Sequence, residues 1–201
     1  MTKNQNQKKR IAVLCSGGGS NLQALIDAQS KQKFNGEIVL VIASNETAFA
    51  LERAKKANIS TATCALKNHD SPQSRDAAIV EELKKHNVDL VVLAGYLGIL
   101  TSTIFDNFKN PIINIHPSLL PKFGGAGMHG IKVHQAVIEA KEKQSGATVH
   151  YVDSGIDTGN IIMQNSLEVL ATDTPQSLQE RILNTIEHSL LVKAVTQLCS
   201  N

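Results

Sequence analysis

The 201-residue chain is poor in aromatic residues and contains no tryptophan; Phe, Tyr and Trp together make up 3% of it. Base-stacking platforms for single-stranded nucleic acids are built from such side chains, so their scarcity argues weakly against them. The net charge of +2 is also small beside the concentrated basic face that nucleic-acid binding usually needs. We therefore expect no nucleic-acid partner.

Cysteine is scarce as well. The chain contains Cys15, Cys64 and Cys199, and these three are too widely spaced to form a metal-binding motif. Such thiols are typical of reduced, cytosolic proteins. No apolar run reaches transmembrane length, and the polar first ten residues do not form a signal peptide. We expect a cytoplasmic protein with no membrane association. The histidines lack a zinc-protease spacing, so no metal is expected.

The chain also lacks internal repeats and linkers, and its length suits one well-filled core. The basic residues of the first ten positions cluster in a polar stretch. We therefore expect a polar tail over residues 1–10 and a single domain over residues 11–201.

Apolar runs alternate with helical patterns along the chain. The expected buried strands are Ile11–Cys15, Ile38–Ala43, Val88–Ala94 and Ile112–Ile115, with Thr61–Cys64 a weaker candidate. The expected helices between them are Asn21–Gln29, Ala48–Ala57, Pro72–His86 and Thr101–Phe105. This order predicts an α/β fold of three layers, with a mostly parallel, Rossmann-like sheet and helices on both faces.

The last third of the chain has a different pattern. Ile131–Ala140 is expected to be helical, Ala147–Val152 and Asn160–Gln164 to be two strands joined by a turn, and Pro175–Leu198 to be a long closing helix with Thr174 or Asp173 as its N-cap.

A glycine-rich run, Ser16-Gly17-Gly18-Gly19-Ser20-Asn21, lies between the first strand and the first helix. Glycines let the backbone approach an anion closely, and the free amides of a helix start can point at it. The run is neither a dinucleotide fingerprint nor a P-loop. A tight turn with an N-cap is the alternative, and the context favours phosphate binding.

The segment Gly95-Tyr96-Leu97-Gly98-Ile99-Leu100 follows a strongly apolar strand. It could form the apolar wall of a ligand pocket. Composition alone favours the simpler interpretation that these residues belong to the core.

Asn114 and His116 share one side of an extended strand, because side chains at i and i+2 do so. An amide donor and a proton-exchanging imidazole suit acyl transfer, although a structural role is about as well supported. Asp153 and Asp157 lie in a later glycine-rich turn. They are turn formers, or one of them pairs with His116 and favours its protonated form.

These motifs, with Asn114 through Pro121, Ser145 through His150 and Asp157-Thr158-Gly159 in order, resemble the phosphoribosylglycinamide formyltransferases. The match runs from Ile11 to about His188. The resemblance implies a formyltransferase fold and a cytoplasmic enzyme of purine and one-carbon metabolism. It would transfer a formyl group from 10-formyltetrahydrofolate, as co-substrate, to glycinamide ribonucleotide, as a monomer or homodimer.

The resemblance also implies the roles of individual residues. Gly19, Ser20 and Asn21 would hold the acceptor's phosphate, Asn114, His116 and Asp157 would be catalytic, and Glu187 would lie near the acceptor's ribose. The folate-binding residues would be Arg75, Leu97, Gly98, Ile99, Leu100, Asn114, Asp153 and Asp157.

The chain departs from the family pattern in several places. Gly98 stands where some members have arginine, the glycine-rich loop Phe123–Gly130 is longer than in the shortest members, and Arg181–Glu187 has one residue more than the usual pattern. The loop could be a substrate lid or an ordinary surface loop.

Two alternatives belong to other classes. A non-catalytic phosphate-binding module would need only the loop Gly17–Asn21, whereas a dehydrogenase is disfavoured by the missing fingerprint. Within the fold, methionyl-tRNA formyltransferase and formyltetrahydrofolate hydrolase normally carry additional domains, and a sugar-nucleotide formyltransferase fits the phosphate loop less well.

Overall fold

The computed structural model describes residues 8–200. The chain divides into two compact units: unit 1 comprises residues 8–111 and 195–200, and unit 2 comprises residues 112–194. The expected polar tail lies mostly outside the described residues, and Lys9 and Arg10 already belong to the first strand. A single domain over residues 11–201 stays a prediction.

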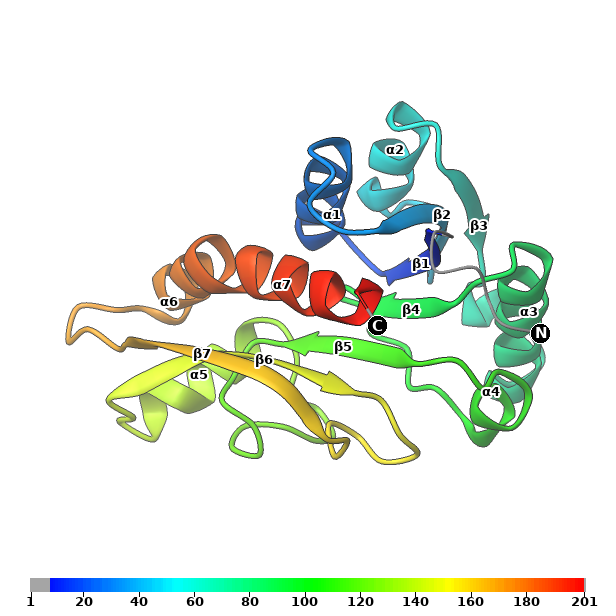
Figure 1. Ribbon diagram of the computed structural model, residues 1–201. Helices are drawn as coiled ribbons and strands as arrows, with labels where there is room; N and C mark the ends of the chain where they lie inside the picture. The colour runs from blue at the N-terminus through cyan, green and yellow to red at the C-terminus, as the bar shows by residue number, and fades with distance from the viewer. Residues whose placement is uncertain (1–7, 201) are drawn as a thin grey trace. The chain divides into compact units, whose positions relative to one another are not determined.

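Unit 1 contains a parallel sheet whose strands follow the order β3-β2-β1-β4 (Figure 1). Its strands are β1 (Lys9–Cys15), β2 (Gly36–Ala43), β3 (Ser60–Thr63) and β4 (Leu90–Leu93). Its helices are α1 (Ser20–Ser30), α2 (Phe49–Lys56), the 3-10 turn η1 (Leu66–Asn68), α3 (Pro72–Lys85) and α4 (Ser102–Asn107). The weaker strand candidate is therefore a strand of the sheet, one residue earlier than expected.

The chain reverses direction across this sheet between β1 and β4. It moves outward from β1 to β2 and β3, and then returns to place β4 on the other side of β1. Because crossovers between parallel strands are right-handed as a rule, this reversal places α1 and α2 on one face of the sheet and α3 on the other. The loops after β1 and β4 thus leave the sheet side by side, where open α/β sheets bind ligands.

The core of unit 1 is built on strands that are apolar along their whole length. In β1, Ile11 through Cys15 are 0% exposed, and in β2 the same holds for Leu40 through Ala43. Continuous burial means that both faces of the sheet are covered. Cys15 is part of this core, and burial raises the pKa of its thiol to about 12, so it stays protonated. Cys64 and Cys199 are likewise free and buried.

Unit 2 contains an antiparallel sheet of β5 (Ile112–His116), β6 (Gln144–Tyr151) and β7 (Ile161–Glu168), with α5 (Ile131–Glu139) before β6. The expected pair of strands joined by a turn is confirmed, although β7 extends further than predicted. The register places Asn114 opposite His150 and His116 opposite Thr148. The polar residues of β5 therefore face polar residues of β6.

The closing helix is not regular. It consists of α6 (Pro175–Ile182), a π-helical turn η2 (Leu183–Glu187) and α7 (His188–Cys199). Thr174 is the N-cap: its side chain accepts a hydrogen bond from the Ser177 amide in a capping box. One uninterrupted helix was predicted over 175–198, and this is wrong at Leu183–Glu187, where the π turn lies. A π turn closes i→i+5 hydrogen bonds and so contains one residue more than an α turn, and it lies within the segment Arg181–Glu187 that was expected to be one residue longer than the family pattern.

Candidate active site

Three successive carbonyls of the glycine-rich loop after β1 accept hydrogen bonds from the segment 45–53. The carbonyl of Ser16 accepts from Asn45 Nδ2 at 2.8 Å, that of Gly17 from the Ala50 amide at 3.1 Å, and that of Gly18 from Arg53 Nε at 2.8 Å. In a trans peptide the N–H points opposite to the carbonyl.

The amides that follow these three carbonyls belong to Gly17, Gly18 and Gly19. Within residues 8–200 they donate to no protein group. Successive backbone amides that point the same way form an anion-binding concavity, and Ser20 and Asn21 directly follow it as the first residues of α1. The predicted phosphate loop thus has three successive backbone amides without a protein partner among the described residues.

Gly19 is required at its position by conformation and by space. Its φ of +69° lies in the left-handed region, and a Cβ there would lie 2.8 Å from the Cβ of Ala50. Gly17 differs, since an added Cβ would meet nothing within 4 Å. The close approach of α2 to the loop therefore depends on Gly19.

Ser16 joins this loop to the loop after β4. Its amide donates to the Gly95 carbonyl at 3.0 Å, and its hydroxyl accepts from the Leu97 amide at 2.8 Å. The two loops predicted to bind acceptor and folate are therefore hydrogen-bonded neighbours. Leu97 and Ile99 are 61% and 64% exposed, so the core interpretation is wrong for both, whereas Leu100 is buried.

The ring of Tyr96 occupies the space that a side chain at position 98 would need. A Cβ at position 98 would lie 2.7 Å from Cε1 of the Tyr96 ring. The Tyr96 hydroxyl is buried with no hydrogen-bond partner among residues 8–200, and burial raises its pKa to about 12. Any side chain at position 98 would therefore require this ring to move.

Arg75 does not lie open to a ligand. It is 4% exposed, donates from Nε and Nη2 to Asp76 Oδ1, and donates from Nη2 to the Ile99 carbonyl at 2.6 Å. Asp76 in turn accepts from the amide and hydroxyl of Thr101. Arg75 therefore supports the segment that carries Ile99 and Leu100, behind the residues that face solvent.

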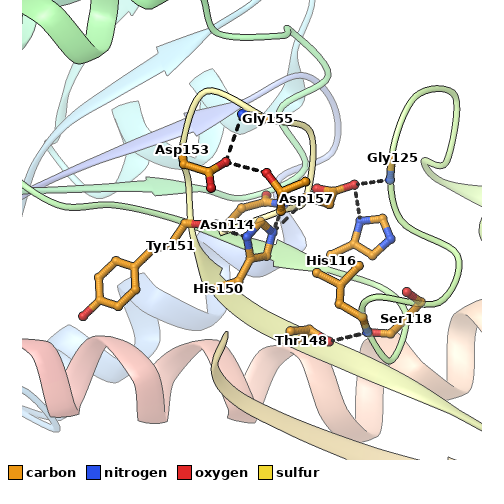
Figure 2. Close-up of polar contacts among 12 residues, drawn as sticks. Asn114, His116, Ser118, Gly125, Thr148, His150, Tyr151, Asp153, Gly155 and Asp157 are labelled. Carbon is orange, nitrogen blue, oxygen red and sulfur yellow. Dashed lines mark hydrogen bonds and ion pairs between the residues drawn. The ribbon is translucent and has the colours of Figure 1, made fainter. Parts of the chain in front are cut away.

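In unit 2, Asp157 lies between two imidazoles, as Figure 2 shows. Its Oδ2 is 3.5 Å from His116 Nδ1, and its Oδ1 is 3.6 Å from His150 Nε2. Asn114 Nδ2 is 3.1 Å from the same His150 nitrogen. The structure thus brings the predicted residues Asn114, His116 and Asp157 into one cluster.

His150 is the member of the cluster that sequence reasoning missed. Its Nδ1 is 2.8 Å from the Tyr151 carbonyl, to which it donates; Nε2 is then free to accept from Asn114. The signal was a polar residue on an otherwise buried strand, but only the β5–β6 register reveals its partner. Arg53 and Asn45, which hold the glycine-rich loop, were missed because only the folded chain brings them to it.

Burial lowers the pKa of His116, which is 4% exposed, below its usual range. The Asp157 carboxylate and the Phe123 carbonyl, 2.8 Å from Nε2, oppose this shift without reversing it. The carboxylate thus favours the protonated form, as expected, but desolvation of the charged ring outweighs the ion pair and the net pKa is lowered. The Phe123 bond assigns the proton to Nε2, so Nδ1 is the basic atom and faces Asp157.

The carboxyl group of Asp157 has a pKa below its usual range. Burial, the largest cause, raises it, but the neighbouring His150 and His116 rings and the Gly125 amide at 3.0 Å together lower it. Asp153 in the same loop serves the turn, since its Oδ1 accepts from the Gly155 amide and the Thr158 hydroxyl. Of the two candidate carboxylates, Asp157 pairs with His116, and the long loop Phe123–Gly130 is tied to it through Gly125.

Two further buried groups lie in unit 2. His134 on α5 is 0% exposed, and neither ring nitrogen has a partner among residues 8–200. Burial, with a smaller contribution from the charge of His116, lowers the pKa of His134 to about 4. Glu187 is 7% exposed and ends the π turn.

Among the described residues, no cluster of three or more His, Cys, Asp or Glu side chains could hold a metal ion. Nor does any helix there have the length and apolar character to cross a membrane.

Comparisons with known proteins show which family this chain belongs to. A family model described as formyl transferase matches residues 9–195. Phosphoribosylglycinamide formyltransferase from Bacillus subtilis is 35% identical over 94% of this chain and 94% of its own. The crystal structure of glycinamide ribonucleotide transformylase 1 from Symbiobacterium toebii is 37% identical, has a TM-score of 0.90 and covers 99% of this chain and 91% of its own. This similarity confirms the predicted fold class.

Some relatives are much longer. The trifunctional purine biosynthetic protein adenosine-3 of Chironomus tentans is 43% identical over 96% of this chain, but the chain spans 14% of that protein.

Proposed function

Because the chain belongs to the formyl transferase family, we propose that it transfers a formyl group from 10-formyltetrahydrofolate to the amine of glycinamide ribonucleotide, in purine biosynthesis. The recognition of this family from sequence is confirmed. The observation that carries the proposed chemistry is the Asp157 carboxylate set between the imidazoles of His116 and His150, with Asn114 bonded to the latter.

We assign the acceptor's phosphate to Gly19, Ser20 and Asn21, at the unpaired amides of the glycine-rich loop. A phosphate monoester carries about −1.5 to −2 charges at neutral pH and accepts strong hydrogen bonds. Glu187 is proposed to lie near the ribose. The single acidic side chain there would accept from ribose hydroxyls.

We assign the formyl donor to a larger set of residues. They are Arg75, Leu97, Gly98, Ile99, Leu100, Asn114, Asp153 and Asp157. The exposure of Leu97 and Ile99 supports an apolar surface for a flat ring. The burial of Arg75 supports a role that acts through the Ile99 carbonyl.

The proposed reaction begins when the neutral glycinamide amine attacks the formyl carbon. The carbonyl oxygen then becomes an oxyanion, to which Asn114 donates a hydrogen bond. The attacking nitrogen becomes positively charged and must lose a proton, while the leaving N10 nitrogen must gain one. No covalent bond to the protein is needed.

His116 suits this proton transfer because its lowered pKa leaves Nδ1 unprotonated at neutral pH. When Nδ1 takes the proton, Nδ1–H can donate to Asp157 while Nε2–H keeps its bond to the Phe123 carbonyl. The imidazolium is thereby stabilised at both nitrogens. It can return the proton to N10, directly or through a water held by Asp157.

A steady-state assay with 10-formyl-5,8-dideazafolate tests the proposal, with deformylation followed optically. Product that forms only when glycinamide ribonucleotide is present supports it. Product without the nucleotide indicates a hydrolase, and absence of product contradicts the proposal and favours the phosphate-binding module. His116→Ala should lose most turnover while the protein stays folded.

A cytoplasmic location and a monomeric or dimeric state stay predictions of this proposal. Cell fractionation tests the first, and sedimentation equilibrium at micromolar concentration tests the second.

A further inference from the structure

Arg53, on α2, contacts the glycine-rich loop through its side chain. Its Nε donates to the Gly18 carbonyl at 2.8 Å, and its Nη1 donates to Gln23 Oε1, in the first turn of α1, at 3.0 Å. Its guanidinium carbon lies 5.1 Å from the centroid of the Phe49 ring. One planar group thus joins the loop, the helix that follows it and α2.

The bond to Gly18 has a directional consequence. The Gly18 carbonyl and the Gly19 N–H belong to one planar trans peptide and point in opposite directions. When Arg53 holds the carbonyl toward α2, it turns the Gly19 amide toward the side where the proposed phosphate lies. Glycine allows the flanking dihedrals many values, so the peptide needs such a constraint to keep one orientation.

The charges around the loop support the same role for Arg53. The loop Ser16–Asn21 contains no basic side chain, whereas a phosphate monoester is a near-dianion. Arg53 places a permanent positive charge on the loop's own carbonyl. Its remaining guanidinium donors have no partner within residues 8–200.

From these contacts we propose that Arg53 is a positioning residue for the phosphate of the acceptor, a role that rests on the proposed function. It fixes the Gly18–Gly19 peptide with its amide toward the phosphate, while its charge lies on the carbonyl side of that peptide. Neither the loop sequence nor any motif match points to it, because it lies on α2, beyond α1 and β2.

The test measures steady-state kinetics of Arg53→Gln with glycinamide ribonucleotide and with glycinamide riboside, which lacks the phosphate. We expect KM for the ribonucleotide to rise about tenfold, equivalent to about 1.4 kcal/mol, with kcat and KM for the formyl donor nearly unchanged. The riboside should be used equally well by both proteins. Arg53→Lys, which keeps the charge, should recover part of the loss.

Lys56→Gln is the matched control, since it removes the same charge from the same helix at an exposed side chain. It should leave both acceptors unaffected. An equal loss with both acceptors in Arg53→Gln would show a merely structural role and overturn the proposal, as would an unchanged KM for the ribonucleotide.

Failure of the proposed function would look different. Wild-type protein that does not turn over the ribonucleotide contradicts that function. Calorimetric titration with inorganic phosphate would then test Arg53 by itself: weaker binding by Arg53→Gln than by wild type supports the positioning role, and equal binding, or no binding by wild type, contradicts it.

Discussion

Asn114 and His150 face each other across β5 and β6, and the amide Nδ2 of the first lies 3.1 Å from Nε2 of the second. His150 also donates from Nδ1 to the Tyr151 carbonyl at 2.8 Å, so its ring is held at both nitrogens. The orientation of the Asn114 amide therefore depends on a side chain that need not touch substrate. An oxyanion donor is effective only when it is held in place before the reaction.

Replacing His150 by alanine should lower kcat about ten- to hundredfold, because an unsupported donor is misplaced rather than absent. Asn114→Ala should cost more, about 10²- to 10³-fold, since the donor itself is lost. The double variant should be no worse than Asn114→Ala alone. Additive losses in a double-mutant cycle would mean that His150 acts independently of Asn114. Circular dichroism of each variant controls for folding.

The acidic limb of the pH–rate profile should lie below the usual histidine range, because His116 must be neutral to accept a proton and its pKa is lowered. Asp157→Asn removes the charge that opposes this lowering, so the limb should move to still lower pH while kcat falls about 10²-fold or more. Asp153→Asn removes the same charge from the same loop, where the carboxylate serves a turn, and should leave the limb in place. A limb that moves upward in Asp157→Asn would contradict the assignment.

Stability should fall in acid because His134 is buried in its neutral form. Its pKa is about 4 in the folded chain against 6.5 when exposed, so the unfolded chain binds this proton first as pH falls. The stabilisation is fully present above pH 6.5 and is lost progressively toward pH 4. His134→Leu should show a smaller drop in Tm between pH 7 and pH 5 than wild type does. Equal drops would mean that other groups dominate acid unfolding.

Gly19→Ala should destabilise the chain by about 1–3 kcal/mol, because alanine is strained at positive φ. Its Cβ would also push against Ala50 and so displace the loop from α2. KM for the acceptor should rise accordingly. Gly17→Ala, where an added Cβ meets nothing within 4 Å, is the control and should be tolerated in both assays. Thermal unfolding and steady-state kinetics together check this pair.

The elements of the fold could largely be predicted from the sequence, because continuous apolar strands and capped helices are local patterns. The i, i+2 relation of Asn114 and His116 also follows from strand geometry alone. His150 and Arg53 could not be identified in this way, since their roles depend on strand register and on the packing of α2. The net lowering of the His116 pKa could not be foreseen, because burial is a property of the folded chain. Arg75 was assigned to the folate site from its position in the family pattern, and only the structure shows that its side chain pairs with Asp76.

The π turn at Leu183–Glu187 fixes how this chain should be compared with its relatives. A helix that gains one residue by ordinary insertion rotates everything beyond it by about 100°, because an α turn has about 3.6 residues. A π turn holds one residue more than an α turn, so a residue gained there leaves the faces of the flanking helices in place. Where a homologue is one residue shorter in this helical region, we expect the alignment gap within these five residues.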